Sequence, residues 1–425
     1  MIVRIRKAAA LGVGAVFMLA TACGTTEPSD SEPEATTTAA PAASEPVDEF
    51  IAGLYEFSES FARSIAQDDE GRENTVYSPV SIAYAFAMLR AGAEGETAAQ
   101  LDAVFGFPAE GLNEAVRALA DEAVTVDDVP PRTEPGETRG PDDEPAEPIV
   151  ALANGLFVQE GLTVESDFTT TLSEYFDAEA QNVDFTSPEA VETIDTWVEE
   201  NTAGRIDQLF DELDPETIAV LANAIYMKAE WENQFSESAT EDDDFTKADG
   251  SVVTVPMMNK QSATVRYATG EDWQAIELPY SGGELSMWVL ISETDDLAAP
   301  PLTASTLEAL ADGGTSVSAD IVLPRWDFGS TVQLLEQLRG LGLTNLSELD
   351  GITSDFMVSD AVHRATITVN EQGTEAAAVT GVAGVTSLPP EAQVEFRADK
   401  PYTFAIMHTP TGAPLFLGSV EDPSQ

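Results

Sequence analysis

The sequence predicts an α+β fold, with helices concentrated early in the chain and strands concentrated later. Apolar residues recur at helical spacing from Asp48 to Ile65, whereas later segments form short runs rich in β-branched and aromatic residues. No repeat with the period of a solenoid or a propeller is present. This segregation favours helices packed on a large sheet over helices that alternate with parallel strands.

The chain begins with the features of an export signal. Basic residues before Ala8 precede an uncharged stretch, 8–22, that is too short for a comfortable membrane span. The stretch runs into LATAC, which resembles a bacterial lipobox, where the chain is cleaved before the cysteine and a lipid is joined to its sulfur. We expect residues 1–22 to be a lipoprotein signal and Cys23 to anchor the exported chain at the outer face of the bacterial membrane. The alternative is an ordinary cleaved signal and an extracellular protein.

Two segments have compositions that do not suit a packed core. Residues 23–47 are polar and proline-rich, which predicts a disordered tether before a folded domain that spans 48–425. Residues 126–148 are acidic and proline-rich, which predicts a long surface loop.

Two helices have clear start signals. Ser78 is expected to cap a helix that opens at Pro79, and the apolar residues on nearly every face of this helix predict that it is buried. Ser187 and Pro188 predict the start of a second helix, and Gly204 predicts its end.

Strand patterns dominate the later part of the chain. Runs of β-branched and aromatic residues between turn signals predict strands at 217–227, 252–258, 273–278, 285–291, 317–323, 365–369, 394–397, 402–407 and 415–420.

The charge of the chain excludes one class of partner. Acidic residues outnumber basic ones 76 to 19, which gives a formal net charge of −57. Nucleic acids and heparin-like polyanions would be repelled, so we expect neither as a partner. We expect a heavily solvated surface, a monomer, and attachment to the membrane by the lipid alone.

The residues that enzymes use for nucleophilic or metal chemistry are scarce. The chain has two histidines, His363 and His408, and its single cysteine lies in the export signal, so an intramolecular disulfide is excluded. There is no G-x-S-x-G elbow, no HExxH motif, no P-loop and no dinucleotide-binding fingerprint. We therefore expect a protein that is not an enzyme and that holds neither metal nor cofactor.

From Asp48 to Pro423 the chain resembles the serpins, single-domain proteins that mostly inhibit serine or cysteine proteases by a conformational trap. The resemblance rests on many motifs in the order of that family: NTVYSPVSIAYAFAMLRAGAEGETAAQL, IDTWVEENTAGRI, NAIYMKAEWENQF, VPMM, ELPY, LPRW, VSDAVHRATITVNEQGTEAAAVT, FRADKPYTFAI and PLFLGSV. It implies helices packed on a large central sheet, further sheets, and an exposed reactive-centre loop at about 371–392. Tyr402 stands where serpins usually have phenylalanine, and 126–148 looks like an insertion.

The resemblance implies two polar sites around the central sheet. Ser78, Ser81, Asn223 and His363 match the buried cluster beneath it, called the shutter. Trp231, Arg325 and Glu371 match the residues at the top of the sheet, called the breach, where the loop first enters. The alternative for the shutter is a set of core polar residues that merely satisfy one another. The alternative for Arg325 and Glu371 is two unrelated surface charges.

The resemblance also assigns the stretch from Glu371 to Thr380 as the hinge of the reactive-centre loop. In a strand, Thr374, Ala376, Ala378 and Thr380 would all point to one face, and none would bury a charge there. Gly373 precedes this series. The run of alanines taken alone would instead suggest a surface helix.

Family spacing counted from both sides places the scissile bond at Ser387–Leu388. A small serine before the bond suits elastase-like or subtilisin-like proteases. Cleavage one bond later would put Pro389 on the leaving side, which most serine proteases reject. A cysteine protease target stays open, as does a non-inhibitory serpin that acts as a binding or chaperone-like surface protein. The unobstructed hinge favours the inhibitor.

Overall fold

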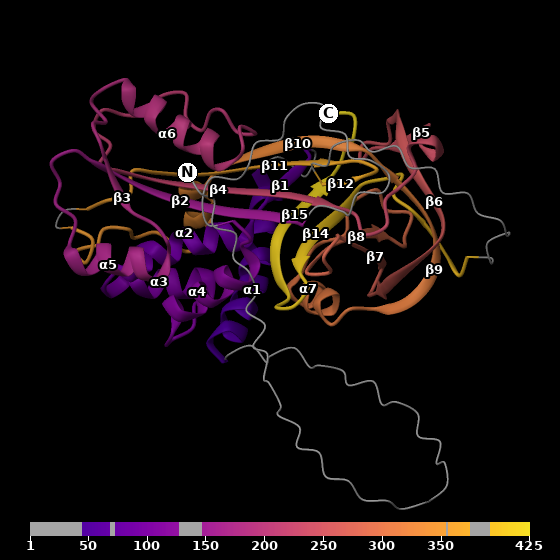
Figure 1. Ribbon diagram of the computed structural model, residues 1–425, viewed down its shortest axis with the longest axis horizontal. Coiled ribbons are helices and arrows are strands. Elements are labelled where there is room, and N and C mark those ends of the chain that lie inside the picture. The colour runs from indigo at the N-terminus through magenta and orange to yellow at the C-terminus, as the bar shows by residue number, and fades with distance from the viewer. Residues whose placement is uncertain (1–44, 69–72, 127–146, 354–355, 375–391) are drawn as a thin grey trace, which may run out of the picture.

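The computed structural model describes residues 45–68, 73–126, 147–353, 356–374 and 392–425. Within these ranges the chain forms eight α-helices and fifteen strands in two sheets (Figure 1). The helices are α1 (Glu45–Asp68), α2 (Pro79–Ala91), α3 (Gly95–Phe105), α4 (Leu112–Ala123), α5 (Ser166–Tyr175), α6 (Glu189–Asn201), α7 (Ala304–Ala311) and α8 (Leu334–Gly340).

A six-stranded sheet crosses the molecule and separates α6 from the helices α2 to α5 (Figure 1). Its strands lie in the order β10 (Trp326–Gln333), β11 (Asp360–Val369), β12 (Gly373–Thr374), β4 (Ala219–Glu230), β2 (Ile149–Gln159) and β3 (Ala180–Val183). The strands β11 and β4 also pair directly, in parallel.

A nine-stranded sheet forms the other part of the molecule. Its strands lie in the order β1 (Thr75–Tyr77), β15 (Ala413–Val420), β14 (Tyr402–His408), β8 (Leu285–Ser292), β7 (Trp273–Pro279), β6 (Val252–Thr269), β9 (Thr315–Pro324) and β13 (Val394–Arg397), with β5 (Glu241–Thr246) paired to β6. This arrangement of helices on large sheets confirms the predicted α+β fold class.

The helix α2 forms the middle of the core, as its sequence predicts. Every residue from Pro79 to Leu89 is buried, and Ser78 Oγ accepts a hydrogen bond from the Ser81 amide at 3.1 Å as the N-cap. A helix that packs against neighbours on all sides needs apolar residues on every face, which is the pattern read from the sequence.

A second apolar cluster lies on the opposite face of the six-stranded sheet. Ile194 and Val198 of α6, with Leu209 and Phe210 from the segment after it, pack on strand residues that include Val220 of β4. The helix α6 and the segment after it therefore cover β4 and β11 on this face.

Some boundaries differ from the sequence prediction. The first helix begins at Glu45 rather than Asp48. The helix expected from Pro188 begins at Glu189, so Pro188 rather than Ser187 occupies the N-cap position, and Ser187 Oγ accepts from the Glu189 amide at 3.3 Å.

The strand β2 has no counterpart among the predicted strands. It reads IVALANGLFVQ, and the alanine, asparagine and glycine at its middle have low strand propensity, so its position is set by pairing with β4 along its length.

Tyr402 stands where serpins usually have phenylalanine. Its buried hydroxyl has no hydrogen-bond partner within the described residues, so the structure offers no compensation for this replacement.

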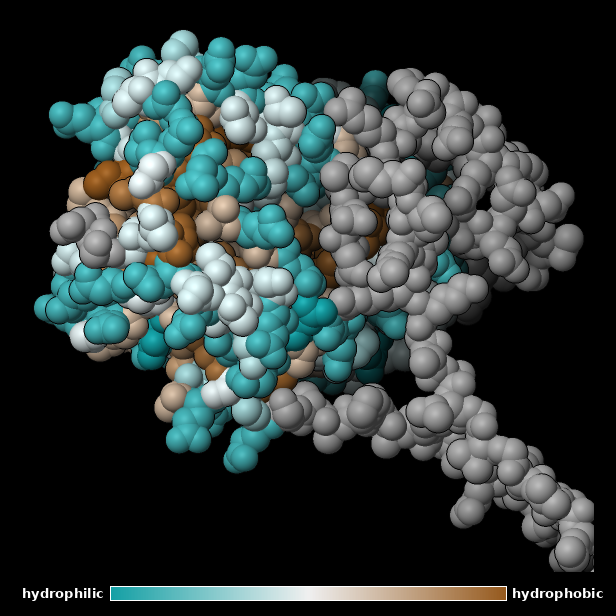
Figure 2. Space-filling model, turned by 60° about the vertical axis from the view of Figure 1, so that its left-hand side comes forward, coloured by the Kyte–Doolittle hydropathy of each residue, from teal (hydrophilic) through white to brown (hydrophobic). Residues whose placement is uncertain are grey.

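One face of the described surface is largely hydrophilic. On the face shown in Figure 2, hydrophilic residues cover most of the coloured surface, and hydrophobic residues show mainly in hollows between them. In the described ranges, no helix has both the length and the apolar character needed to cross a membrane.

Candidate functional site

The beginning of the predicted hinge is already a strand. Gly373 and Thr374 form β12, which lies between β11 and β4 at one end of the six-stranded sheet. Thr374 pairs with Val369 of β11 and with Ala229 of β4, and Gly373 pairs with Glu230. The chain therefore enters the sheet at the position from which a longer strand could continue.

Beyond β12 the two flanking strands are not paired with each other within the described residues. Direct pairing between β11 and β4 is confined to five pairs, from Asp360 with Val220 to Arg364 with Ala224. Within the described residues, the backbones of 225–228 and 365–368 form no ladder with each other. We call the space between these two segments the strand gap. Side chains of both strands line a small cavity there, directly next to Thr374.

Gly373 is required by the close approach of two backbones. A Cβ atom at this position would lie 2.1 Å from the carbonyl oxygen of Ala229, and the φ angle of 155° is one that other residues rarely adopt. The turn before it is closed by Asn370, whose Oδ1 accepts from the amides of Gln372 and Gly373 at 3.0 and 3.2 Å.

Glu371 is tied down on several sides. Its side chain is only 2% exposed, and its Oε1 accepts hydrogen bonds from Arg325 Nε at 2.7 Å, from Arg325 Nη2 and from the Thr240 hydroxyl. Its carbonyl oxygen accepts from the Phe235 amide at 2.8 Å. A carboxylate buried to this extent needs such partners, because an unpaired charge away from water is costly.

Trp231 and Tyr280 form an aromatic pair beside the hinge. Their rings stack at 4.4 Å with an interplanar angle of 13°, and Trp231 Nε1 donates to the Asn370 carbonyl at 2.9 Å. The Tyr280 hydroxyl lies 2.6 Å from the Thr374 hydroxyl, and burial raises the pKa of Tyr280 well above its ordinary value. Tyr280 ends the ELPY motif, but nothing along the chain links it to Thr374, so the sequence alone indicates no role for it.

The four predicted shutter residues also come together. His363 Nε2 accepts from the Ser78 amide at 3.1 Å, while His363 Nδ1 lies 2.7 Å from Asn223 Oδ1. Asn223 Nδ2 donates to the Ser81 carbonyl at 2.7 Å. These contacts require a neutral imidazole with its proton on Nδ1, and burial lowers the pKa of His363 from 6.5 to about 3.

Ser81 contributes to this cluster through its backbone. Its amide donates to Ser78 Oγ and its carbonyl accepts from Asn223, whereas its own hydroxyl has no partner among the described residues.

Asn154 also belongs to this cluster, although nothing in the sequence identified it. Its Oδ1 accepts from Asn223 Nδ2 at 2.6 Å. Asn154, Asn223 and His363 are direct cross-strand neighbours on β2, β4 and β11, so they form one polar row across three strands. The sequence did not predict β2, so it could not show that Asn154 lies beside Asn223 on the neighbouring strand.

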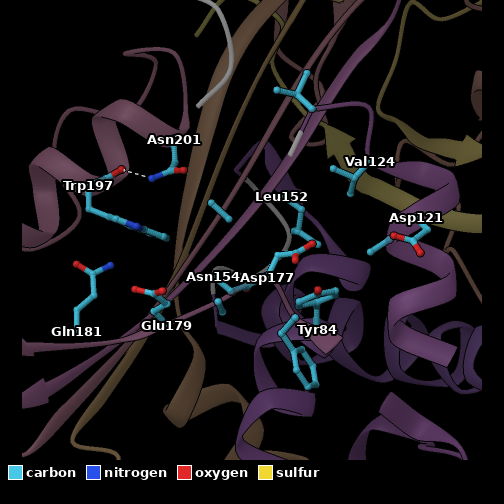
Figure 3. Close-up of a pocket in the computed structure, with 15 residues that line it drawn as sticks. Tyr84, Asp121, Val124, Leu152, Asn154, Asp177, Glu179, Gln181, Trp197 and Asn201 are labelled. Carbon is cyan, nitrogen blue, oxygen red and sulfur yellow. Dashed lines mark hydrogen bonds between the residues drawn. The ribbon is translucent and has the colours of Figure 1, made fainter. Parts of the chain in front are cut away.

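Asn154 also borders a pocket of about 260 Å³ beside β2 (Figure 3). Trp197 and Asn201 of α6 lie on one side of it, and Tyr84, Val124 and Asp121 lie on the other. Its lining contains carboxylates but no histidine, serine or cysteine. In the part of the chain that the structure describes, no three His, Cys, Asp or Glu side chains are grouped to hold a metal ion.

Several predicted site residues lie outside the described residues. They are Cys23, Ala376, Ala378, Thr380, Ser387 and Leu388, together with most of the acidic segment 126–148.

The chain was compared with known proteins and structures. A sequence profile described as "Serpin (serine protease inhibitor)" matches residues 52–423. Iripin-5 from Ixodes ricinus is 35% identical over 364 residues, which cover 82% of this chain and 88% of that protein. Neuroserpin from Homo sapiens is 30% identical, with 83% and 86% covered.

Solved structures show the same fold. The native state of the thermophilic serpin Tengpin superposes with a TM-score of 0.76 at 23% identity, covering 91% of this chain and 96% of that one. Native protease nexin-1, solved with heparin, gives a TM-score of 0.72 at 28% identity, covering 89% and 100%.

Proposed function

Because the chain belongs to the serpin family, we propose that it inhibits a serine endopeptidase by inserting its cleaved reactive-centre loop into the six-stranded sheet. The observation that carries the proposal is the position of β12 between β11 and β4, with the strand gap directly beyond it. A chain that continues from Thr374 along this gap would run between two strands that, in the described ranges, do not pair with each other there.

The chemistry follows from the predicted bond. The serine hydroxyl of the protease attacks the carbonyl carbon of Ser387, the bond to the Leu388 nitrogen breaks, and that nitrogen leaves with the proton. The product is an ester between the protease serine and Ser387. The 14 residues from Thr374 to Ser387 would span about 45 Å as a strand, at roughly 3.3 Å per residue. Insertion would therefore carry the tethered protease far from the site of attack.

Complete insertion requires the sheet to open further. The five pairs between β11 and β4 must separate, and one of them joins His363 to Asn223. Since both side chains are buried, their hydrogen bond resists opening in the intact chain. The polar row thus supports a closed sheet until the free end of the cleaved loop competes for the two edges.

The hinge side chains suit rapid insertion. Thr374 is 3% exposed and faces Tyr280 in the sheet. Ala376, Ala378 and Thr380 would follow on the same face, and none presents a charge or a bulky group. Speed matters because the ester must be displaced before it is hydrolysed.

We further propose that the targets are elastase-like or subtilisin-like proteases, because Ser387 is small. We also propose that a lipid on Cys23 anchors the protein to the cell membrane. Both proposals rest on sequence: Val385 and Thr386 precede Ser387 in a loop without basic residues, and LATAC ends the export signal. The protein would act at the outer face of the cell membrane, where it meets extracellular proteases.

The first experiment mixes the purified chain with subtilisin or pancreatic elastase and separates the products under denaturing conditions. We expect a covalent complex that resists SDS and a released C-terminal peptide that begins at Leu388. The matched control is Leu388→Pro, which places proline on the leaving side of the bond and should prevent the complex. Complete cleavage of the native sequence at this bond, with no complex at any ratio of the two proteins, would refute inhibition.

A further inference from the structure

A second pocket lies away from the hinge, between the C-terminal half of α1 and the end of the nine-stranded sheet. It has a volume of about 600 Å³, which is within the range of about 300–1,000 Å³ that small-molecule sites occupy. Strands β1, β14 and β15 form its floor, and the segment before α7 forms one side. Its lining shares no residue with the hinge, the shutter or the breach.

Three hydroxyls lie in register on the floor. Thr75, Ser419 and Thr403 are direct cross-strand neighbours on β1, β15 and β14, and all three line the pocket. The hydroxyls of Thr75 and Ser419 lie 3.1 Å apart. Thr403 is 7% exposed, and its hydroxyl has no hydrogen-bond partner within the described residues. A buried hydroxyl without a partner is costly, so a ligand that donates to it after a small shift of the floor would be stabilised.

The walls are apolar. Ala62, Ile65 and Ala66 come from α1, and the opposite side is the run LAAPPL at 297–302. Two consecutive prolines stiffen this run, because the pyrrolidine ring fixes φ. An apolar ligand body would therefore be enclosed between a helix and a restrained loop.

The charges of the lining select against anions. Among the described residues, the pocket is bordered by four carboxylates, Glu59, Glu73, Asp296 and Glu421, and by one cation, Arg63. Arg63 is already engaged by Glu59 at 2.5 Å, and the other carboxylate oxygen of Glu59 accepts from the Ala304 amide at 2.9 Å. A carboxylate or phosphate on a ligand would meet unfavourable charge.

We propose that this pocket binds a small neutral amphiphile, with its apolar body between α1 and the 297–302 run and a hydroxyl or N–H group over the hydroxyls of Thr75, Ser419 and Thr403. The site is independent of protease inhibition, so either proposal can fail without the other.

The test uses the full chain and the neutral fluorescent dye N-phenyl-1-naphthylamine, which has an aromatic body and one N–H donor. We expect saturable binding with increased fluorescence. Decanol should displace the dye, and decanoate, which has the same chain length but a charge, should be weaker by about tenfold or more. Equal displacement by decanol and decanoate would overturn the assignment to neutral ligands.

Two variants locate the site. Ala66→Trp should fill the pocket and weaken dye binding by about tenfold or more, whereas Ala103→Trp, at an exposed position of α3, should leave binding unchanged. Thr403→Val removes the hydroxyl at nearly constant shape and should weaken binding severalfold, and Thr403→Ser should restore it. Native near-UV circular dichroism is required of each variant. Wild-type dye affinity in a folded Ala66→Trp chain would refute this site.

Discussion

At the scale of single residues, the hinge is held by contacts of different kinds. Glu371 is fixed by charge, through Arg325 and the Thr240 hydroxyl. Gly373 is fixed by space, because any side chain would strike the Ala229 carbonyl. Thr374 is fixed by burial and by the Tyr280 hydroxyl. These contacts define where the inserting part of the loop must begin.

Thr374 gives a residue-scale prediction. In Thr374→Arg, keeping position 374 between β11 and β4 would bury a guanidinium beside Tyr280, at a cost of several kcal/mol for an unpaired ion. We expect the variant to be cleaved like the native chain while the yield of covalent complex falls by about tenfold or more. The measurement is the ratio of complex to cleaved chain on a denaturing gel. Thr374→Ser, which keeps the hydroxyl, is the matched control, and an undiminished complex in Thr374→Arg would exclude the inward role of this position.

At the scale of elements, the polar row lies across β2, β4 and β11. Its hydrogen bond between Asn223 and His363 joins β4 to β11, the two strands that must separate on insertion. Ser78, Asn223 and His363 could be proposed from sequence motifs, because each lies in a segment of characteristic order and spacing. Asn154 and Tyr280 could not, since each reaches its partner only through strand register or through packing at the end of a sheet.

The helices and later strands were predictable where a local pattern was strong. The buried helix after Ser78 follows from its apolar faces and its cap. The strand β2 did not follow, because its middle residues favour no strand by themselves and the pairing with β4 sets its position. The short strand β12 depends on a single turn at Asn370 and on pairing with the two flanking strands. No local sequence pattern predicts it.

The titration of His363 gives an element-scale prediction. The pKa of its imidazole falls from 6.5 to about 3 in the closed sheet. At pH values between these two, a state that exposes the imidazole therefore binds one more proton than the closed sheet does. The stability that His363 gives to the closed sheet is therefore complete above pH 6.5 and decreases as the pH falls, by about 1.4 kcal/mol per unit at most. Heat-induced polymerisation should accelerate as the pH is lowered from about 7 to 5.

Variants separate this effect from general acid sensitivity. His363→Gln should polymerise faster than the native chain at about pH 7 and should show a shallower rise towards acid. His408→Gln removes the other buried histidine, which bonds to Thr411 away from the strand gap, and should keep the native pH dependence of polymerisation. Native polymerisation rates in His363→Gln at both pH values would contradict the role assigned to the row.

At the scale of the whole molecule, two features act independently of the fold. The net charge of −57 should repel polyanions and suits a solvated surface. The proposed anchor at Cys23 would hold this acidic domain near the membrane through the segment 23–47, with the domain free to meet proteases.

The anchor yields a whole-molecule prediction. We expect the native chain, expressed in a bacterium, to partition with the detergent phase and to carry an acylated N-terminal cysteine by mass spectrometry. Cys23→Ser should remove the lipid and shift the protein to the aqueous phase. A native chain found in the aqueous phase with an unmodified Cys23 would show that the signal is of the ordinary type.

The central claim is that the strand gap is filled by the loop after cleavage. Hydrogen–deuterium exchange of peptides covering 225–228 and 365–368, before and after cleavage by a target protease, tests it most directly. Amides that point into the gap should exchange more slowly after cleavage than in the intact chain, because the inserted loop supplies hydrogen-bond partners to both strands. Unchanged exchange in both segments after cleavage at Ser387–Leu388 would contradict insertion at this position.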